Sequence, residues 1–451
     1  MKIPGSTSLA ASLLCAASMW FYVQHVLIPY QVNDAAQHER PRGNFSDLYP
    51  RWLGARELLL HHRDPYSPEI TAEIQAGYYG RPLDASRPSD PKDQQAFAYP
   101  LYVVFLLAPT VFLPFHLVQP LFQCLLVVLT GLSAWLWLKA IRWEPLRTVF
   151  PAILVFSLCN FPAVQGVKLQ QLSLFVCALI AISVACVTRN RLWSAGFVLA
   201  LATIKPQLTV LPAAWLLLWA GSDFRRRRGL IYGFFLTLIS LTIASELLLP
   251  GWITRFAQAL SAYTQYADGW GSTLDALMTP LGGRSVAVLL VAGAAVLAWR
   301  ARHDPAESPV FVFYTVLLLA LVVVVLPMTS PYNQLLLLPG TLLLARDWRY
   351  LWHGRLARLL TSILVLAIGW PWLAAAGLAA ASVVRSAKSI QQAWALPLYT
   401  SLAIPSAVLV LLMAYARANL KTVGSFAGGS ATNKATTTSA LPTNTRTSSS
   451  Q

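Results

Sequence analysis

Lys205 is the residue that most needs a chemical explanation, because no other charged side chain occurs between Arg191 and Asp223. An ionisable group within an apolar segment is costly unless a partner or a ligand takes up its charge. One interpretation is a lysine whose ammonium reaches the membrane surface along its apolar stem. The other is a cation held in a cavity to meet an anion such as a phosphate. The second interpretation makes Lys205 a candidate substrate-binding residue.

Acidic residues are concentrated in one polar segment, residues 31–97, which holds ten of the eighteen Asp and Glu residues. Within it Asp47 precedes a helical pattern, since apolar residues at 48, 52, 55 and 59 share one helix face. We expect a helix over 47–61 that lies at the membrane surface with this face toward the lipid. A carboxylate beside a cationic pocket suits transfer from a phosphate-activated donor. The carboxylate takes a proton from an acceptor hydroxyl, and the cation stabilises the leaving phosphate.

Asp47 is the first choice for this general base. Two alternatives remain: Asp47 only begins the helix, because Asp favours helix starts, or Asp34, nearer the end of the first apolar segment, is the functional acid. Arg51 follows Asp47 by one helical turn and shares its face. It either pairs with that acid or touches the donor phosphate.

Three amides lie in short polar breaks between apolar runs, at Gln171, Asn333 and Gln334. An amide both donates and accepts hydrogen bonds, so these side chains are candidates to bind sugar hydroxyls. Each break is equally compatible with an ordinary solvated or proline turn between two helices.

The composition excludes several classes of protein. Hydrophobic residues make up 56% of the 451 residues and charged residues 12%, whereas an ordinary soluble protein carries about 25% charged residues. No charged residue occurs in 98–138, 310–345, 359–384 or 389–416, and such runs match the thickness of a bilayer. A soluble enzyme and a disordered chain are therefore excluded. The five cysteines all lie in apolar segments, which excludes a disulfide scaffold.

The net charge of +16 does not indicate nucleic-acid binding, because the basic residues form short clusters between apolar blocks. Placing these clusters in the cytoplasm gives 18 basic residues inside against 6 in the short outer loops. Segments 31–97 and 250–283 then become the first and second extracytoplasmic loops. The scheme requires that the proline-rich stretch 99–118 does not cross the membrane.

These patterns predict an all-α polytopic membrane protein with about twelve transmembrane helices. The expected spans are 7–30, 120–141, 148–163, 170–187, 192–204, 207–220, 229–249, 284–300, 309–327, 332–346, 359–378 and 394–415. The first is either an uncleaved span or a signal peptide, and its continuation to Tyr30 favours a span. We expect one membrane domain over 1–422. Residues 423–451, rich in Ser and Thr, are predicted to be a disordered cytoplasmic tail.

Five strings of the sequence resemble glycosyltransferase family 87 and occur in that family's order. The first is an acid, a short helix and then Asp-Pro-Tyr, over 47–66. The others are FAYPLYVVFLLAP at 97–109, LQQLSLFVCAL at 169–179, AGFVLALATIKP at 195–206 and SPYNQLLLLPG at 330–340. Together they cover roughly residues 20–345 of the chain.

The resemblance implies a GT-C fold and a polyprenyl-phosphate sugar donor, commonly polyprenyl-phosphate mannose. It also implies transfer to a lipid or glycan acceptor outside the cytoplasm, in the plasma (inner) membrane, and it places the family's base at Asp47. The sequence departs from the family pattern at three places. Arg63 replaces the usual Gly before Asp-Pro-Tyr, Gln170 replaces the Gly of Gly-Gln, and Asn333 and Gln334 stand where many members carry His.

Two other functions remain open on the sequence: a twelve-span secondary transporter, and a GT-C-like polysaccharide ligase or polymerase. Transporters usually contain internal repeats, and we find no matched halves. No nucleotide-binding loop or zinc-protease motif occurs. We expect no organic cofactor and no metal-ligand spacing, although first-loop carboxylates could bind Mg²⁺ or Mn²⁺. The expected partners are the lipid-linked donor, the acceptor and membrane lipids.

Overall fold

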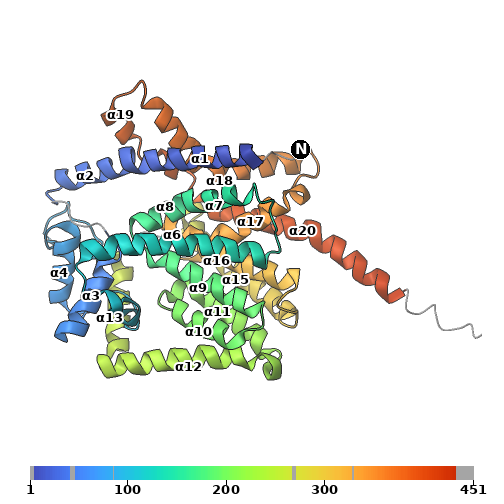
Figure 1. Cartoon of the computed structure of the whole chain (residues 1–451), viewed down its shortest axis with the longest axis horizontal. Coiled ribbons are helices and arrows are strands. Elements are labelled where there is room, and N and C mark those ends of the chain that lie inside the picture. Colours follow the sequence, from blue (N-terminus) through green and yellow to red (C-terminus); the bar gives the residue numbers. More distant parts are fainter. Residues whose placement is uncertain (1–4, 41–45, 85, 267–270, 328–329, 433–451) are drawn as a thin grey trace, which may run out of the picture.

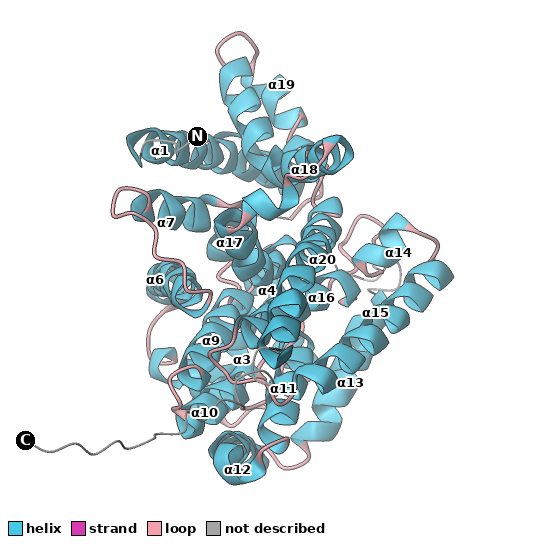
Figure 2. Cartoon of the chain, turned by 90° about the vertical axis from the view of Figure 1, so that its right-hand side faces the viewer, coloured by secondary structure: helices cyan, strands magenta, loops and turns pink. Residues whose placement is uncertain are grey.

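The computed structural model describes residues 5–40, 46–84, 86–266, 271–327 and 330–432. In these ranges all regular secondary structure is helical and no strand occurs (Figure 1, Figure 2). The all-α prediction is confirmed. A helix satisfies its own backbone hydrogen bonds, which an apolar chain in lipid requires.

Six helical segments of the described chain are long and apolar enough to cross a membrane. They are Gly5–Gln37 (α1 Gly5–Phe21, η1 Tyr22–Leu27 and α2 Ile28–Gln37), α6 Phe115–Ala140, α12 Phe224–Leu248, α15 Pro280–Ala301, α18 Arg355–Ala381, and Ala387–Asn419. The last contains α19 Ala387–Gln392, η5 Leu396–Leu398 and the start of α20 Ala403–Thr432. The helices α7 Phe150–Cys159 and α8 Phe161–Lys168 meet at 56° and make a seventh if they form one span. The protein is therefore a multi-pass membrane protein.

Shorter helices occupy the remaining segments for which spans were predicted. They are α9 Leu172–Val187, α10 Leu192–Ala202, α11 Pro206–Gly221, α16 Pro309–Val325, and η3 Pro331–Leu337 followed by α17 Leu338–Arg346 and η4 Trp348–Leu351. Every predicted span thus contains a helix, while twelve complete crossings stay a prediction. Proline at the first turn sets where α11 and α16 begin, because its missing N–H has no partner there anyway.

The proline-rich stretch 99–118 folds into two short pieces, α5 Val103–Leu107 and η2 Ala108–Thr110, before α6 begins at Phe115. Neither piece is long enough to cross a bilayer. The Tyr102 hydroxyl donates to the Thr203 carbonyl oxygen at 3.0 Å, which ties the stretch to the α10–α11 turn. Part of the stretch packs against the protein core, and its broken form agrees with the expectation that it does not cross the membrane as one helix.

The first loop contains α3 Tyr49–His61 and α4 Pro68–Tyr79. The helix predicted over 47–61 is confirmed, but the prediction that its apolar face meets lipid is wrong. Leu48, Trp52 and Ala55 are buried in the protein core. The Trp52 indole N–H donates to the Thr110 carbonyl oxygen at 3.2 Å, because the proline-rich stretch lies beneath the helix.

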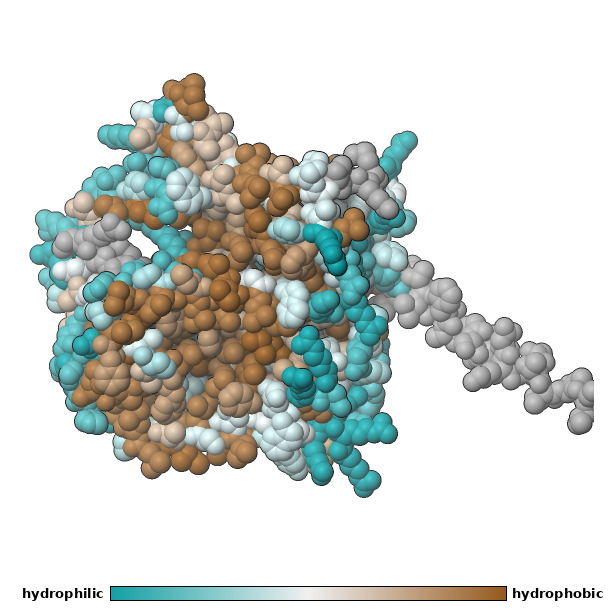
Figure 3. Space-filling model, viewed as in Figure 1, coloured by the Kyte–Doolittle hydropathy of each residue, from teal (hydrophilic) through white to brown (hydrophobic). Residues whose placement is uncertain are grey.

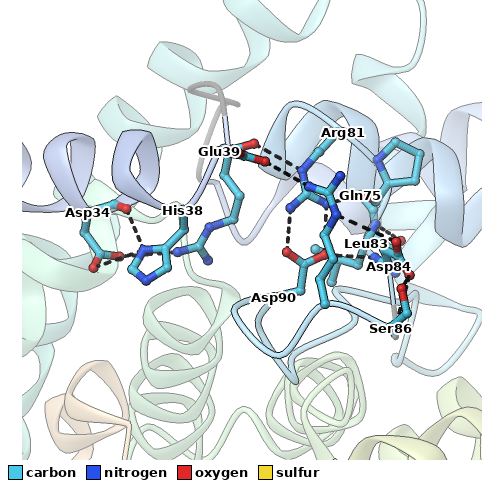
Figure 4. A network of polar contacts seen from close by, with 12 residues as sticks. Asp34, His38, Glu39, Gln75, Arg81, Leu83, Asp84, Ser86 and Asp90 are labelled. Atoms are coloured by element: carbon cyan, nitrogen blue, oxygen red, sulfur yellow. Dashed lines mark hydrogen bonds and ion pairs between the residues drawn. The ribbon is translucent and has the colours of Figure 1, made fainter.

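Ion pairs hold the outer part of this loop together (Figure 4). The Arg81 guanidinium donates to both carboxylate oxygens of Asp90, at 2.9 and 2.5 Å. It also donates to the Glu39 carbonyl oxygen at 3.1 Å, and Arg87 pairs with the Glu39 carboxylate at 3.2 Å. This network joins the end of α2 to the segment that precedes α5.

The two ends of the molecule are more hydrophilic than its middle (Figure 3). Figure 1 shows α3, α4 and α13 (Trp252–Tyr266) together at one end, away from the end where α20 leaves the body. Arg227, in the first turns of α12, donates to the carbonyl oxygens of Arg302 (3.0 Å) and Asp304 (3.4 Å) and so ties α12 to the turn between α15 and α16. In Figure 3 apolar residues cover the middle of the face and hydrophilic residues gather toward its two sides. This is the pattern expected across a bilayer.

Two packed cores lie side by side in the described chain. The larger one contains α3, α5, α6, α9 to α11, α16 and α17, and the smaller one contains η1, α18 and α19. Figure 2 shows α1, α18 and α19 on one side of the remaining helices.

The backbone of α20 continues to Thr432, past Val423 where the tail was predicted to begin, and 433–451 lie outside the described residues. The second loop also holds a short helix, α14 Thr273–Leu277.

Candidate active site

A cavity of about 290 Å³ lies where the N-terminal end of α3, the α10–α11 turn, α13 and η3 meet. Five of the seven predicted site residues line it, namely Asp47, Arg51, Gln171, Lys205 and Asn333. They come from four segments that are far apart in the sequence. The fold therefore collects the isolated polar residues of the apolar segments beside the acidic first loop.

Asp47 is held at the wall of the cavity by its backbone and by its side chain. Its N–H donates to the Leu169 carbonyl oxygen at 2.9 Å, which docks the start of α3 on the α8–α9 turn. The Gln171 amide nitrogen donates to Asp47 Oδ2, and the Tyr78 hydroxyl donates to Oδ1 at 3.3 Å. Burial raises the pKa of Asp47, while Arg51, the Gln171 hydrogen bond and Lys205 act in the opposite direction. A carboxylate in such a position is a stronger base than one in water.

Lys205 is buried at the α10–α11 turn, with only 6% of its surface exposed, and still lines the cavity. Its ammonium donates to Gln171 Oε1 at 2.8 Å and to the Ser173 hydroxyl at 2.7 Å. It also lies 5.3 Å from the ring centre of Tyr332 and 5.7 Å from that of Tyr99. These partners are all neutral, so the cation is stabilised without being neutralised. An anionic group entering the cavity would meet a cation that forms no direct ion pair with the described residues.

Arg51 supplies a second cation from the next turn of α3. Its Nη1 donates to the carbonyl oxygen of Asp47 at 3.1 Å, and its guanidinium stacks over the Tyr99 ring at 4.5 Å. Its Nε is buried and has no hydrogen-bond partner. Arg51 therefore contacts the backbone of Asp47 and is not engaged in a closed ion pair with its carboxylate.

The structure does not bring Asp34 and Gln334 to the cavity. Asp34 lies near the end of α2, where it contacts Arg40 at 3.4 Å and His38 at 3.6 Å. The Gln334 amide donates to the Ser401 carbonyl oxygen at 2.7 Å and lines a separate apolar cavity of about 310 Å³. Consecutive residues of η3 point to different sides, so Asn333 and Gln334 were predicted together but separate in the fold.

Sequence reasoning missed several residues at this site. Ser173 connects Lys205 to Asn333, since its hydroxyl donates to Asn333 Oδ1 at 2.7 Å. Asp93 is the second acid of the cavity wall and accepts hydrogen bonds from the Gln95 N–H and amide, at 3.0 and 2.8 Å. Ser173 stands two residues after Gln171 at the start of a helix, a signal that could have found it. Nothing in the sequence distinguishes Asp93 from the other acids of the loop.

The described residues include no group of three or more His, Cys, Asp or Glu side chains that could hold a metal ion. The cavity wall carries two carboxylates, Asp47 and Asp93, beside the two cations. This set can supply proton transfer at Asp47 and charge stabilisation at Lys205 and Arg51.

Comparison with known families identifies the chain. The model of glycosyltransferase family 87 matches residues 97–327, just over half of the 451 residues. The chain belongs to glycosyltransferase family 87. Membership makes this membrane protein a glycosyltransferase, in agreement with the resemblance, and does not support the transporter alternative. A search of curated proteins finds no match.

The family match includes Lys205 and Gln171, but it begins after Asp47 and ends before Asn333. The first-loop and η3 residues therefore enter the site on geometric grounds. Both segments line the same cavity as Lys205.

Proposed function

We propose that this protein transfers a sugar from a polyprenyl-phosphate donor to a lipid or glycan acceptor, with Asp47 as general base. The observation that carries the proposal is the cavity in which a partly buried carboxylate and a buried lysine are joined by the Gln171 amide. The GT-C fold, a site on the extracytoplasmic face of the plasma (inner) membrane and mannose as the sugar are part of the same proposal.

The proposed reaction uses Asp47 and Lys205, which line the same cavity. An acceptor hydroxyl attacks the anomeric carbon of the sugar while its proton passes to Asp47. The bond between that carbon and the phosphate oxygen breaks, and its electron pair stays on the polyprenyl phosphate. Lys205, with Arg51 nearby, stabilises the charge that accumulates on the phosphate. Asp47 then releases the proton to water.

A phosphate-linked donor fits the cavity because its two cations have neutral side-chain partners. The membrane-embedded helices on either side suit a donor that arrives with a hydrocarbon chain, and membrane lipids complete its surroundings. The proposed step needs no organic cofactor. A requirement for a divalent cation is tested by adding a chelator to the assay.

The donor class is tested with membranes that contain the protein and a radiolabelled sugar donor. Labelled polyprenyl-phosphate mannose should transfer its sugar to a new lipid or glycan product, whereas the same sugar on a nucleotide should not do so directly. Membranes without the protein are the control. Transfer from the nucleotide sugar in the absence of any lipid-linked intermediate would contradict the proposed donor.

A further inference from the structure

Gln171 is the one predicted sugar-binding amide whose two functional ends both contact charged protein groups in the described structure. Its Nε2 donates to Asp47 Oδ2 and its Oε1 accepts from Lys205 Nζ at 2.8 Å. Only 5% of its surface is exposed. The residue is thus enclosed between the carboxylate and the cation.

The two charges fix the direction of this amide. If the amide were turned over, its oxygen would face the carboxylate of Asp47 and its NH₂ group would face the ammonium of Lys205. Both contacts would then be repulsive, because a carboxylate accepts hydrogen bonds and an ammonium only donates them. The orientation is therefore set by Asp47 and Lys205 together.

The chain of hydrogen bonds continues beyond Lys205 with the same donor-to-acceptor direction. The ammonium donates to the Ser173 hydroxyl, which in turn donates to Asn333 Oδ1, each at 2.7 Å. The oxygen of Asn333 is engaged, so its remaining capacity is that of a donor. One end of the chain therefore presents the carboxylate of Asp47, and the other end presents N–H groups that suit an anion.

We propose that Gln171 is a positioning residue that links the donor-binding cation to the base, and that it holds Asp47 by Oδ2 so that Oδ1 accepts the proton of the acceptor hydroxyl. This inference rests on the proposed function, since it assumes that Asp47 is the base. Oδ1 is available because its contact with the Tyr78 hydroxyl, at 3.3 Å, is longer than an ordinary O–H···O bond.

The amide also favours the ionised form of Asp47, because a hydrogen bond to a carboxylate lowers its pKa. Other titratable groups interact electrostatically with Asp47 from several surrounding elements. They are Arg51 on α3, Tyr78 and Tyr79 on α4, Asp93 before α5, Lys168 at the end of α8, Lys205 and Tyr332. Changing residue 171 to Met removes its hydrogen bonds to Asp47 and to Lys205 together, so the pH dependence measures the whole link between the two charges.

The test compares the pH dependence of acceptor kcat/KM, at saturating donor, in the purified full-length wild-type, Gln171→Met and Gln171→Glu proteins. Met keeps the length of the side chain but cannot donate a hydrogen bond. The acidic limb of the pH profile, where kcat/KM falls as the pH is lowered, should therefore move to higher pH by about one unit. This shift corresponds to a tenfold loss of ionised Asp47 at low pH. Glu adds a like charge beside Asp47 and should move the limb further. If Gln171→Met does not accumulate, Gln171→Glu, which keeps the shape, carries the test.

Gln170→Met is the matched control. Gln170 is also buried, and its amide donates to the carbonyl oxygens of Val167 and Lys168 at 2.9 and 2.6 Å. The Gln170→Met substitution should lower the stability of the protein and leave the acidic limb of the pH profile in place. The inference would be overturned if the acidic limb of the pH profile stayed at the wild-type pH in both Gln171 variants.

The Asp47→Asn protein separates this inference from the proposed function. If Asp47→Asn is inactive but the Gln171 variants keep the wild-type limb, Asp47 remains the base and the linking role is wrong. If Asp47→Asn keeps wild-type activity with the same limb, the assignment of the base fails, and the inference fails with it.

Discussion

Two sets of charged residues, one in the outer part of the first loop and one at the cavity, show how differently the same residue types are used. In the outer network, Arg81 pairs with Asp90, and Arg87 pairs with Glu39, so each charge meets its opposite (Figure 4). In the cavity, the hydrogen-bond partners of Lys205 are an amide and a hydroxyl. In the first set the charges are paired with each other, and these ion pairs stabilise the structure of the loop. The second leaves charge available to a ligand.

The comparison shows that the number of acids in a segment does not identify a catalytic one. Ten acids lie in residues 31–97, yet only Asp47 and Asp93 line the cavity. Others form ion pairs, such as Asp64 with Arg255 on α13 and Glu73 with Arg63. What distinguishes Asp47 is its place on the cavity wall, where its side-chain hydrogen-bond partners are the neutral Gln171 and Tyr78. The variants below test this difference, from the largest expected effect to the smallest.

Asp47→Asn should cause the largest loss of activity. The amide keeps the size of the side chain but cannot take a proton, so turnover should fall by about 10³-fold. Turnover is measured with labelled donor and purified protein, at equal amounts of protein in the membrane. Asp90→Asn, the matched change in the outer network, should keep turnover within a few-fold of wild type. Equal losses in both variants would contradict the distinction.

Lys205→Met should have the next largest effect. The apolar stem is kept and the ammonium is lost, so the donor KM should rise and kcat/KM for the donor should fall by about 10²-fold. The acceptor KM should change much less. Arg87→Met removes a cation of the outer network and is the control. An unchanged donor KM in Lys205→Met would favour a structural role for Lys205.

Acidification should inactivate the enzyme before it loosens the outer network. Burial raises the pKa of Asp47 above 3.8, so activity is lost as the pH falls through that raised value. The ion pair with Arg81 lowers the pKa of Asp90 below 3.8, so the stabilisation by this pair is present above its unfolded value and is lost only as the pH falls through the lower one. Activity and limited proteolysis of the loop, both followed against pH, check the order. The prediction would be wrong if, as the pH is lowered, the first loop became sensitive to protease at a higher pH than that at which activity is lost.

Arg81→Ala should have the smallest catalytic effect of the four changes. It removes a partly buried bidentate ion pair with Asp90, and neither residue lines the cavity. We expect faster proteolysis of the first loop and a turnover within about threefold of wild type. A much larger loss of turnover would mean that the network also sets the position of Asp47.

Hydropathy and charge predict most of the fold, because long apolar runs in lipid can only form helices. Every expected span contains a helix, and the proline-rich stretch 99–118 is too broken to form one crossing. The placement of the α3 apolar face could not be predicted. It depends on the chain folding back beneath that helix, a contact between residues 52 and 110.

The site was predictable where a polar residue stood alone among apolar ones. Lys205 was found in this way, Gln171 and Asn333 were found because they lie in short polar breaks between apolar runs, and all three line the cavity. Gln334 was predicted with Asn333, but η3 turns it toward a different cavity. Asp93 was missed because its role depends on where the loop returns to the cavity. Isolation in the sequence thus reveals a buried polar residue, whereas its direction is a property of the fold.

The most direct test of the central claim measures donor binding and sugar transfer in the same purified protein. Asp47→Asn should bind labelled polyprenyl-phosphate mannose as tightly as wild type, because Lys205 and Arg51 remain, and should transfer almost none of the sugar. Transfer by Asp47→Asn at a rate near that of wild type would contradict the assignment of Asp47 as the base.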